Sequence, residues 1–326
     1  AGRLAPRHPV IRYLSDDEVA ALLPAPADAC ELARQSLVEL ANGLVDLPPK
    51  PSVRPRPAGF VNAMPAYCSV PDVVAVKIVG VYQSNRARGL PTIAGVVISV
   101  DPETGRIRGI LGAGSLTAAR TAAATGACMA RLAPAAPGPL GMTGAGVEAR
   151  THLLVADALG WHDVVVYDHR ASNIESLTAW AAEHVPAVRL RAAASPGAAA
   201  EGAACVVTGI PIGADGGELP LASVRDDALV LPIDYSTSVG AELANSAELL
   251  ASDDPDQLAA VATLGHFQGW RALDGPVGRW LADAGPARPA GRVVVANLGV
   301  GAHDAVFAKA ILDRAEALDS GTLLSE

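Results

Sequence analysis

Aromatic residues, cysteines and blocks of like charge are all scarce in this 326-residue sequence. Phe, Trp and Tyr together make up 4% of the chain, whereas 50% of it is hydrophobic, so we expect cores built from small aliphatic side chains. The net charge of −9 comes from 34 acidic and 25 basic residues without a long run of either sign. This pattern excludes a typical nucleic-acid-binding surface and favours small-molecule chemistry.

The cysteines lack the close pairs that metal sites and redox motifs require. They are Cys30, Cys68, Cys128 and Cys205. We expect reduced thiols, no disulfide and no bound metal. No apolar run reaches the roughly 18 residues of a membrane span, and residues 1–18 lack the hydrophobic centre of a signal peptide. The sequence therefore predicts a cytoplasmic protein without membrane association.

The first third of the chain predicts a mostly antiparallel α+β fold. Ser15 and Glu18 form a capping box that opens a helix, and a second helix is expected over 28–40. Strands are expected over 59–66 and 73–82. The runs "VVISV" and "IRGIL", joined by the turn "DPETGR", predict a hairpin.

The rest of the chain alternates strand and helix patterns. A helix is expected over 115–132, and strands are expected in "PLGMT", "DVVVYD", "AVRLR", "ACVVTG", "LVLPID" and "RVVVAN". Helical patterns separate several of these strands, and a last helix is expected over 302–318. Such alternation predicts a parallel, doubly wound sheet of the α/β class.

A dinucleotide-binding fingerprint follows the first of these strands. The run G-x-G-x-x-A consists of Gly144, Ala145, Gly146, Val147, Glu148 and Ala149. Its glycines permit a tight turn and a close approach of a pyrophosphate, and Asp168 lies about 20 residues on, where a carboxylate binds the adenosine ribose. Asp168 favours NAD. His169 and Arg170 favour the alternative, NADP, because they could accept a 2′-phosphate.

Lys77 lies in the middle of the strand "VVAVKIVGVY", both faces of which are apolar. A strand covered on both sides would bury the ammonium at a cost of several kcal/mol unless an anion lies nearby. Arg54 and Arg120 are two further cations in the same part of the chain. With Lys77 they could hold a substrate carboxylate. The alternative is an edge strand whose lysine discourages aggregation.

Five segments resemble the ornithine cyclodeaminase/mu-crystallin family. They are "NAMPAY", "AVKIVGVYQSNRARGLPTIAGVVISVDPETG", "LTAARTAAATGACMARLAP", "TGAGVEARTH" and "NLGVGAHDAVFAKAIL". The resemblance implies a homodimer. It also implies a substrate-binding and dimerisation domain over 1–122 and 303–326, and a Rossmann domain over 123–302.

The resemblance also implies roles for single residues. Lys77, Arg120 and Arg54 match cations that bind the substrate carboxylate, with Arg56 as a rival to Arg54, and Thr92 matches a cofactor contact. Further cofactor contacts are predicted at Thr121, Thr208 and His303. Cyclodeaminases carry a catalytic aspartate after the fifth Rossmann strand. Here Ser236 takes that position and Asp234 lies two residues earlier, so both are candidates for proton transfer, with a turn or cap role as the alternative for Asp234.

The predicted function is an NAD(P)-dependent oxidoreductase acting on the C–N bond of a small α-amino or cyclic α-imino acid. One alternative is an ornithine or lysine cyclodeaminase that forms proline or pipecolate with release of ammonia. A ligand-binding member without catalysis is an alternative of another class. His266 is interpreted as a surface-turn residue, with a place in the lining of the pocket as the alternative, and Asp304 as a helix N-terminal charge.

Overall fold

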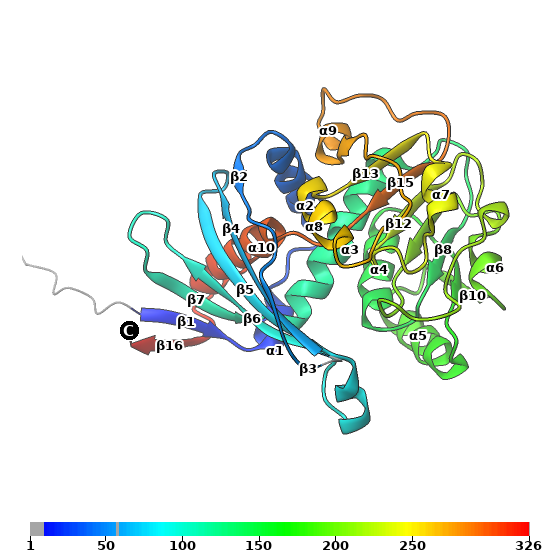
Figure 1. Cartoon of the computed structure of the whole chain (residues 1–326). Helices are drawn as coiled ribbons and strands as arrows, with labels where there is room; N and C mark the ends of the chain where they lie inside the picture. Colours follow the sequence, from blue (N-terminus) through cyan, green and yellow to red (C-terminus); the bar gives the residue numbers. More distant parts are fainter. Residues whose placement is uncertain (1–9, 57–58, 326) are drawn as a thin grey trace, which may run out of the picture. The chain divides into compact units, whose positions relative to one another are not determined.

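The computed structural model describes residues 10–56 and 59–325, which divide into two compact units (Figure 1). The first unit takes its residues from Ala1–Pro24, Leu44–Thr117 and Gly301–Glu326, and the second from Ala25–Gly43 and Ala118–Val300. The long helix α3, Gly114–Leu132, therefore contributes to both. Residues 25–43 group with the second unit, whereas the sequence had assigned them to the first. The domain roles themselves stay a prediction.

The first unit is built on a mixed sheet. Its elements are β1 Val10–Leu14, α1 Asp16–Leu22, β2 Val45–Asp46, β3 Ser52–Arg56, β4 Gly59–Cys68, β5 Val73–Tyr82, the 3-10 helix η1 Gln83–Arg88, β6 Ile93–Val100, β7 Ile107–Gly112, α10 Gly301–Ala317 and β16 Thr322–Ser325. The strand order is β16-β1-β7-β6-β5-β4-β2, and β3 pairs with β4. The capping box of α1 and the β6–β7 hairpin are confirmed.

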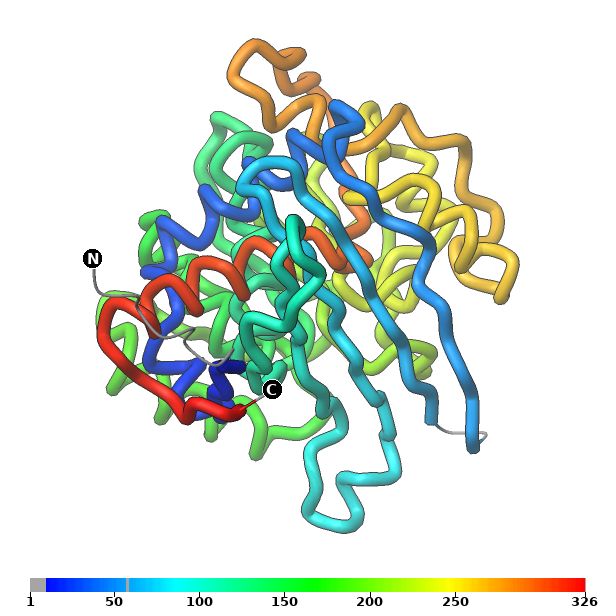
Figure 2. The backbone as a smooth tube through the Cα atoms, turned by 90° about the vertical axis from the view of Figure 1, so that its left-hand side faces the viewer, coloured from blue at the N-terminus to red at the C-terminus, as the bar shows by residue number. Residues whose placement is uncertain are grey.

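The two faces of this sheet differ in burial. α10 packs on β4, β5 and β6, and side chains on that face such as Met64, Lys77 and Val97 are buried (Figure 1). The opposite face carries Ile78, which is 42% exposed. Within a single chain, a helix packs on only one face of β5, so the expectation of a strand covered on both sides is not met by one copy alone. The loop around η1 extends past the strand ends (Figure 2).

The second unit contains the doubly wound parallel sheet that the sequence predicts. Its elements are α2 Pro26–Ala41, β8 Leu140–Thr143, α4 Val147–Ala158, β9 Asp163–Tyr167, α5 Ala171–His184, β10 Arg189–Ala192, α6 Pro196–Ala200, β11 Cys205–Thr208, the 3-10 helix η2 Leu221–Ser223, β12 Leu229–Pro232, α7 Ala241–Asn245, β13 Leu249–Ser252, α8 Pro255–Ala262, β14 Gly275–Pro276, α9 Gly278–Leu281 and β15 Val293–Ala296. The strand order is β10-β9-β8-β11-β12-β15-β13-β14, and all strands are parallel. From β8 the chain first adds strands on one side of the sheet, and from β11 onward it adds them on the other, so the strand order reverses between β8 and β11. Ligands of such sheets bind outside the carboxyl ends of the strands at this reversal.

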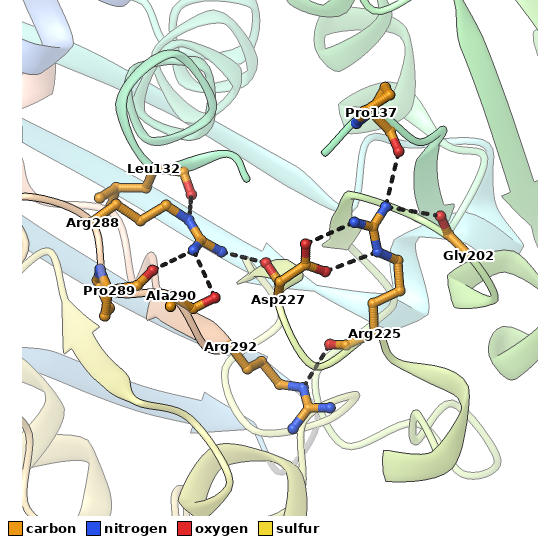
Figure 3. A network of polar contacts seen from close by, with 9 residues as sticks. All are labelled: Leu132, Pro137, Gly202, Arg225, Asp227, Arg288, Pro289, Ala290 and Arg292. Atoms are coloured by element: carbon orange, nitrogen blue, oxygen red, sulfur yellow. Dashed lines mark hydrogen bonds and ion pairs between the residues drawn. The ribbon is translucent and has the colours of Figure 1, made fainter. Parts of the chain in front are cut away.

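Arginine side chains form hydrogen bonds and an ion pair between the segments that precede the parallel strands (Figure 3). Arg225 forms a bidentate pair with Asp227, just before β12, and donates to the carbonyl of Pro137, just before β8. Arg288 donates to the carbonyls of Asp227 and Leu132. Arg292, just before β15, donates to the carbonyl of Arg225 at 3.1 Å. The network leaves the opposite, carboxyl edge of the sheet as the place where loops are available for binding.

All four cysteines are buried and free, as expected, and burial raises the pKa of Cys30 to about 11. In residues 10–56 and 59–325, no helix combines the length and apolar character that crossing a bilayer requires.

Candidate functional site

The glycine turn after β8 has the shape of a dinucleotide-binding turn. Gly144 has φ +93°, and a Cβ there would lie 2.5 Å from the carbonyl oxygen of Gly209, so only glycine fits. Gly146 faces open space on its Cβ side. It precedes α4, whose first amides have no side-chain cap. These residues fit a pyrophosphate, because uncapped amides at a helix start favour an anion.

Asp168 follows β9 and bonds to the glycine turn. Its Oδ2 accepts from the Ala145 amide at 2.9 Å, and its Oδ1 accepts from the Arg170 amide and from Asn173 Nδ2. Burial opposes ionisation, but these three donors together lower the pKa of Asp168 below its usual range. Asp168 is thus held as a carboxylate beside the turn. The neighbouring side chains of His169 and Arg170 are exposed.

The remaining predicted cofactor residues are spread over both units. Val147, the first residue of α4, is 71% exposed, and the Thr208 hydroxyl is buried and donates to Asp234 at 3.0 Å. Thr121 lies half-buried in α3. In the first unit, Thr92 is half-buried before β6, and His303 is completely buried in the first turn of α10. Their contacts to a cofactor stay predictions.

Lys77 has an anionic partner within its own unit. Its Nζ donates to Asp304 Oδ1 at 2.8 Å and to Thr117 Oγ1 at 3.4 Å. The side chains of Lys77 and Asp304 are 1% and 0% exposed. β5 lies between β4 and β6, so the edge-strand alternative is wrong. Asp304 does occupy the first helical turn, as expected, but its carboxylate also neutralises a buried ammonium.

The other predicted carboxylate-binding cations differ in exposure. Arg54 on β3 is exposed, and its guanidinium lies 5.5 Å from the centre of the Phe60 ring. Its rival Arg56 is also exposed and donates to the carbonyl of Pro55. Arg120 on α3 is buried against Gly299, where a Cβ would collide with the guanidinium. The glycine, at φ +76°, is therefore needed for this approach.

Asp253, which the sequence reasoning missed, fixes that same turn. Its Oδ2 accepts from the Gly299 amide at 2.7 Å, and its Oδ1 accepts from the Asp254 amide at 2.9 Å. The side chain is 1% exposed at the carboxyl end of β13. Its signal in the sequence was only the acidic run "SDDPD" after an apolar strand.

Asp234 is a buried carboxyl held by three donors. Thr208 Oγ1 donates to Oδ1 at 3.0 Å, and Ser238 Oγ and the Ile210 amide donate to Oδ2 at 2.6 and 3.3 Å. Burial raises the pKa of Asp234, although these donors oppose the change. The group joins the loops after β11 and β12. This arrangement favours the turn role that was left open.

Ser236 lies at the carboxyl edge of the same sheet. Its Oγ accepts from the Phe267 amide at 2.9 Å and so connects the loop after β12 to the turn after α8. The rings of Tyr235 and His266 meet edge to face, 5.1 Å apart at 85°. His266 is half-buried between two turns, so its interpretation as a surface-turn residue stays a prediction. The local signal was "GHFQGW", two glycines on either side of His266 and Phe267, followed by Trp270.

Comparisons with known proteins agree with the fold. The family model described as ornithine cyclodeaminase/mu-crystallin family matches residues 13–315. The chain is 29% identical to a nodulation efficiency protein of Rhizobium meliloti, over 97% of this chain and 98% of that protein. It is 37% identical to a Δ1-pyrroline-2-carboxylate reductase of Burkholderia ambifaria, over 41% of this chain and 42% of the reductase.

Solved structures show the same fold along nearly the whole chain. Δ1-pyrroline-2-carboxylate reductase of Thermococcus litoralis, solved with NADH and L-proline, has a TM-score of 0.85 at 20% identity over 96% of this chain and 99% of that one. An archaeal alanine dehydrogenase dimer with bound NAD has a TM-score of 0.84 at 20% identity over 97% and 99%. Because the family model spans nearly all of the sequence, this chain belongs to the ornithine cyclodeaminase/mu-crystallin family.

Proposed function

We propose that this protein is an NAD(P)-dependent oxidoreductase acting on the C–N bond of a small α-amino or cyclic α-imino acid. The observation that carries the proposal is the glycine turn at the switch point of the parallel sheet, where Gly144 admits no side chain and Gly146 leaves space for a pyrophosphate. The resemblance to a Δ1-pyrroline-2-carboxylate reductase supports the substrate class.

The dinucleotide would be held by the amides at the start of α4 and by Asp168. A carboxylate beside the turn favours the ribose hydroxyls of NAD, because it repels the 2′-phosphate of NADP. The lowered pKa of Asp168 supports this preference, since the group is ionised at neutral pH. Arg170 is exposed and could accept a 2′-phosphate, so NADP is the second cofactor to be compared.

The substrate carboxylate would be bound by cations. Lys77, Arg120 and Arg54 carry this role in our proposal, and Asp304 keeps the Lys77 ammonium ionised and fixed in direction. When bound, the nicotinamide accepts or supplies a hydride at the α-carbon of the substrate. The protein's own contribution is orientation of that carbon and transfer of a proton at the substrate nitrogen.

A substrate panel tests the function. We expect NADH oxidation with Δ1-pyrroline-2-carboxylate or Δ1-piperideine-2-carboxylate, and slower oxidation of NADPH, measured by absorbance of the reduced nicotinamide. Ornithine and lysine are assayed in parallel for ammonia. Ammonia release without net change in absorbance would instead identify a cyclodeaminase. Dinucleotide binding without turnover of any panel member would identify a non-catalytic binding protein and contradict the proposal.

We further propose that the chain forms a homodimer through the exposed face of its first sheet. Directly paired residues in adjacent strands point to the same side, and the side opposite α10 is apolar across β4, β5 and β6. Its centre consists of Val61, Ala63, Val76, Ile78, Val96 and Ile98, each half-buried or exposed. Monomeric soluble proteins rarely expose so continuous an apolar face. A second copy is the occupant we propose, and the archaeal alanine dehydrogenase of the same fold is itself a dimer.

Free, buried cysteines support a cytoplasmic location.

Ile78→Lys should convert the dimer to a monomer. The side chain is 42% exposed at the centre of the apolar face, so a lysine there would place two ammonium groups in a dry interface. Light scattering coupled to size-exclusion chromatography measures the mass. Leu318→Lys, at a residue that is 62% exposed after α10, is the matched control and should stay dimeric. A monomeric wild-type protein, or a dimeric Ile78→Lys variant, would contradict the proposal.

A further inference from the structure

The loops after β12 and α8 contain backbone conformations that ordinary residues avoid. Tyr235 has φ +60° and Phe267 has φ +56°, and Gly265, two residues before Phe267, has φ +96°. A left-handed conformation costs of the order of 1 kcal/mol for a residue with a Cβ and persists only where the surroundings impose it. Such residues gather at functional sites. Here Gly265 and Phe267 flank His266 in the chain, and the Tyr235 ring meets its ring edge to face.

The surroundings that impose this conformation are visible. The Phe267 amide donates to Ser236 Oγ, and Gln268 Nε2 donates to the carbonyls of Ala262 and His266. The Phe267 ring is buried in an apolar cluster with Leu258, Val261, Ala296 and Leu298. The turn is therefore anchored at its backbone and at the neighbouring side chain. His266, between Gly265 and Phe267, remains half-buried with its ring against Tyr235.

The carboxyl edge of this sheet offers few groups that can exchange a proton near neutral pH. Asp234 already accepts from three donors, and Asp253 from two amides. Burial raises the pKa of Tyr235 further above its alkaline value, with Asp253 adding to the rise and Arg120 opposing it. An imidazole is the side chain whose ordinary pKa lies between pH 5 and 8. Two described imidazoles lie at this edge: His169, after β9, is exposed, whereas His266 is half-buried against the loop after β12. His266 is thus the partly enclosed group whose chemistry matches proton transfer.

We propose that His266 is the general acid–base residue of the proposed reaction, and that Ser236 acts as a positioning residue by holding the turn that carries it. The inference rests on the proposed function. In the direction of reduction, the imidazolium of His266 donates its proton to the nitrogen of the C=N bond while the α-carbon accepts a hydride from the reduced nicotinamide dinucleotide. The π electron pair of the C=N bond forms the new N–H bond. The neutral imidazole then regains a proton from water.

The test compares His266→Gln with wild type in oxidation of NADH by Δ1-pyrroline-2-carboxylate and Δ1-piperideine-2-carboxylate. We expect kcat to fall by about 100-fold or more, because a glutamine cannot exchange a proton. The affinity for NADH should stay unchanged. The wild-type rate should decrease as pH rises through the titration of the imidazolium, and the variant should lose this dependence. His184→Gln, an exposed histidine stacked on Trp180, is the matched control and should leave kcat unchanged.

Two further variants separate catalysis from folding. His266→Ala should regain part of its rate with added imidazole, which a misfolded protein cannot do. Ser236→Ala should lower kcat by only about tenfold, less than the roughly 100-fold of acid–base catalysis itself, while keeping the pH dependence of wild type. Retention of kcat within threefold in His266→Gln would overturn the inference and leave the oxidoreductase intact. Absence of turnover by wild type on both imino acids would overturn the proposed function, and the inference with it.

Discussion

Lys77→Met is expected to lower the free energy of unfolding by about 3 to 5 kcal/mol. The ammonium and the Asp304 carboxylate are 2.8 Å apart and are at most 1% exposed, so removing the lysine leaves a carboxylate buried without this cation. Asp304→Asn should cost a similar amount for the opposite reason. Denaturation by urea, followed by circular dichroism, gives these values. No turnover is expected from Lys77→Met, because the substrate carboxylate loses its cation.

The double variant Lys77→Met/Asp304→Asn distinguishes stability from function. It removes both charges together, so its loss of unfolding free energy should be well below the sum of the losses of the two single variants. Its activity should stay as low as that of Lys77→Met. Additive losses would mean that the pair does not couple. An active double variant would show that Lys77 is not needed to bind the substrate.

Acidification from pH 6.5 to 4 is expected to destabilise the protein through His152. This side chain on α4 is 3% exposed, with Nδ1 2.7 Å from the Glu148 carbonyl oxygen and Nε2 3.1 Å from Thr125 Oγ1. Burial lowers the pKa of His152 to about 4. The unfolded chain binds a proton near pH 6.5, so between the two values the unfolded state holds more protons than the folded state. Stability is thus complete above pH 6.5 and falls by about 3 kcal/mol toward pH 4.

Comparison with His152→Gln isolates this contribution. The variant retains the carboxylates and other histidines, so only the proton taken up at position 152 differs. Urea unfolding at pH 7, 6, 5 and 4 should show a smaller loss of stability in the variant than in wild type. Equal losses at every pH would show that His152 is not buried in its neutral form.

Local patterns in the sequence predicted the elements around the site well. The capping box at Ser15, the β6–β7 hairpin and the parallel strands after Leu140 all have short-range signals, namely cap residues, turn residues and apolar runs. The pairing of β1 with β16 was not predicted, because these strands are more than 300 residues apart in the chain. Their short, half-exposed sequences carry no partner information.

The candidate site was predictable in its residue types but not in their partnerships. The sequence indicated that Lys77 needs an anion, yet Asp304, 227 residues away, is identified only by the fold. The three donors to Asp234 come from β11 and from the loops after β11 and β12, and the sequence does not indicate that these loops lie close together. For His266, the ring contact with Tyr235 depends on two strained turns that no periodicity encodes.

The ion pair of Lys77 also determines which alignment of β5 can form. Apolar residues occupy both sides of this strand, so hydrophobicity alone distinguishes poorly between the native pairing with β4 and β6 and one shifted by a single residue. A shift would turn Lys77 toward the exposed side and bring Val76 or Ile78 against Asp304. The shifted sheet would bury a carboxylate beside an aliphatic side chain and lose the 2.8 Å contact. A single charged residue thus gives an otherwise ambiguous strand one permitted alignment during folding.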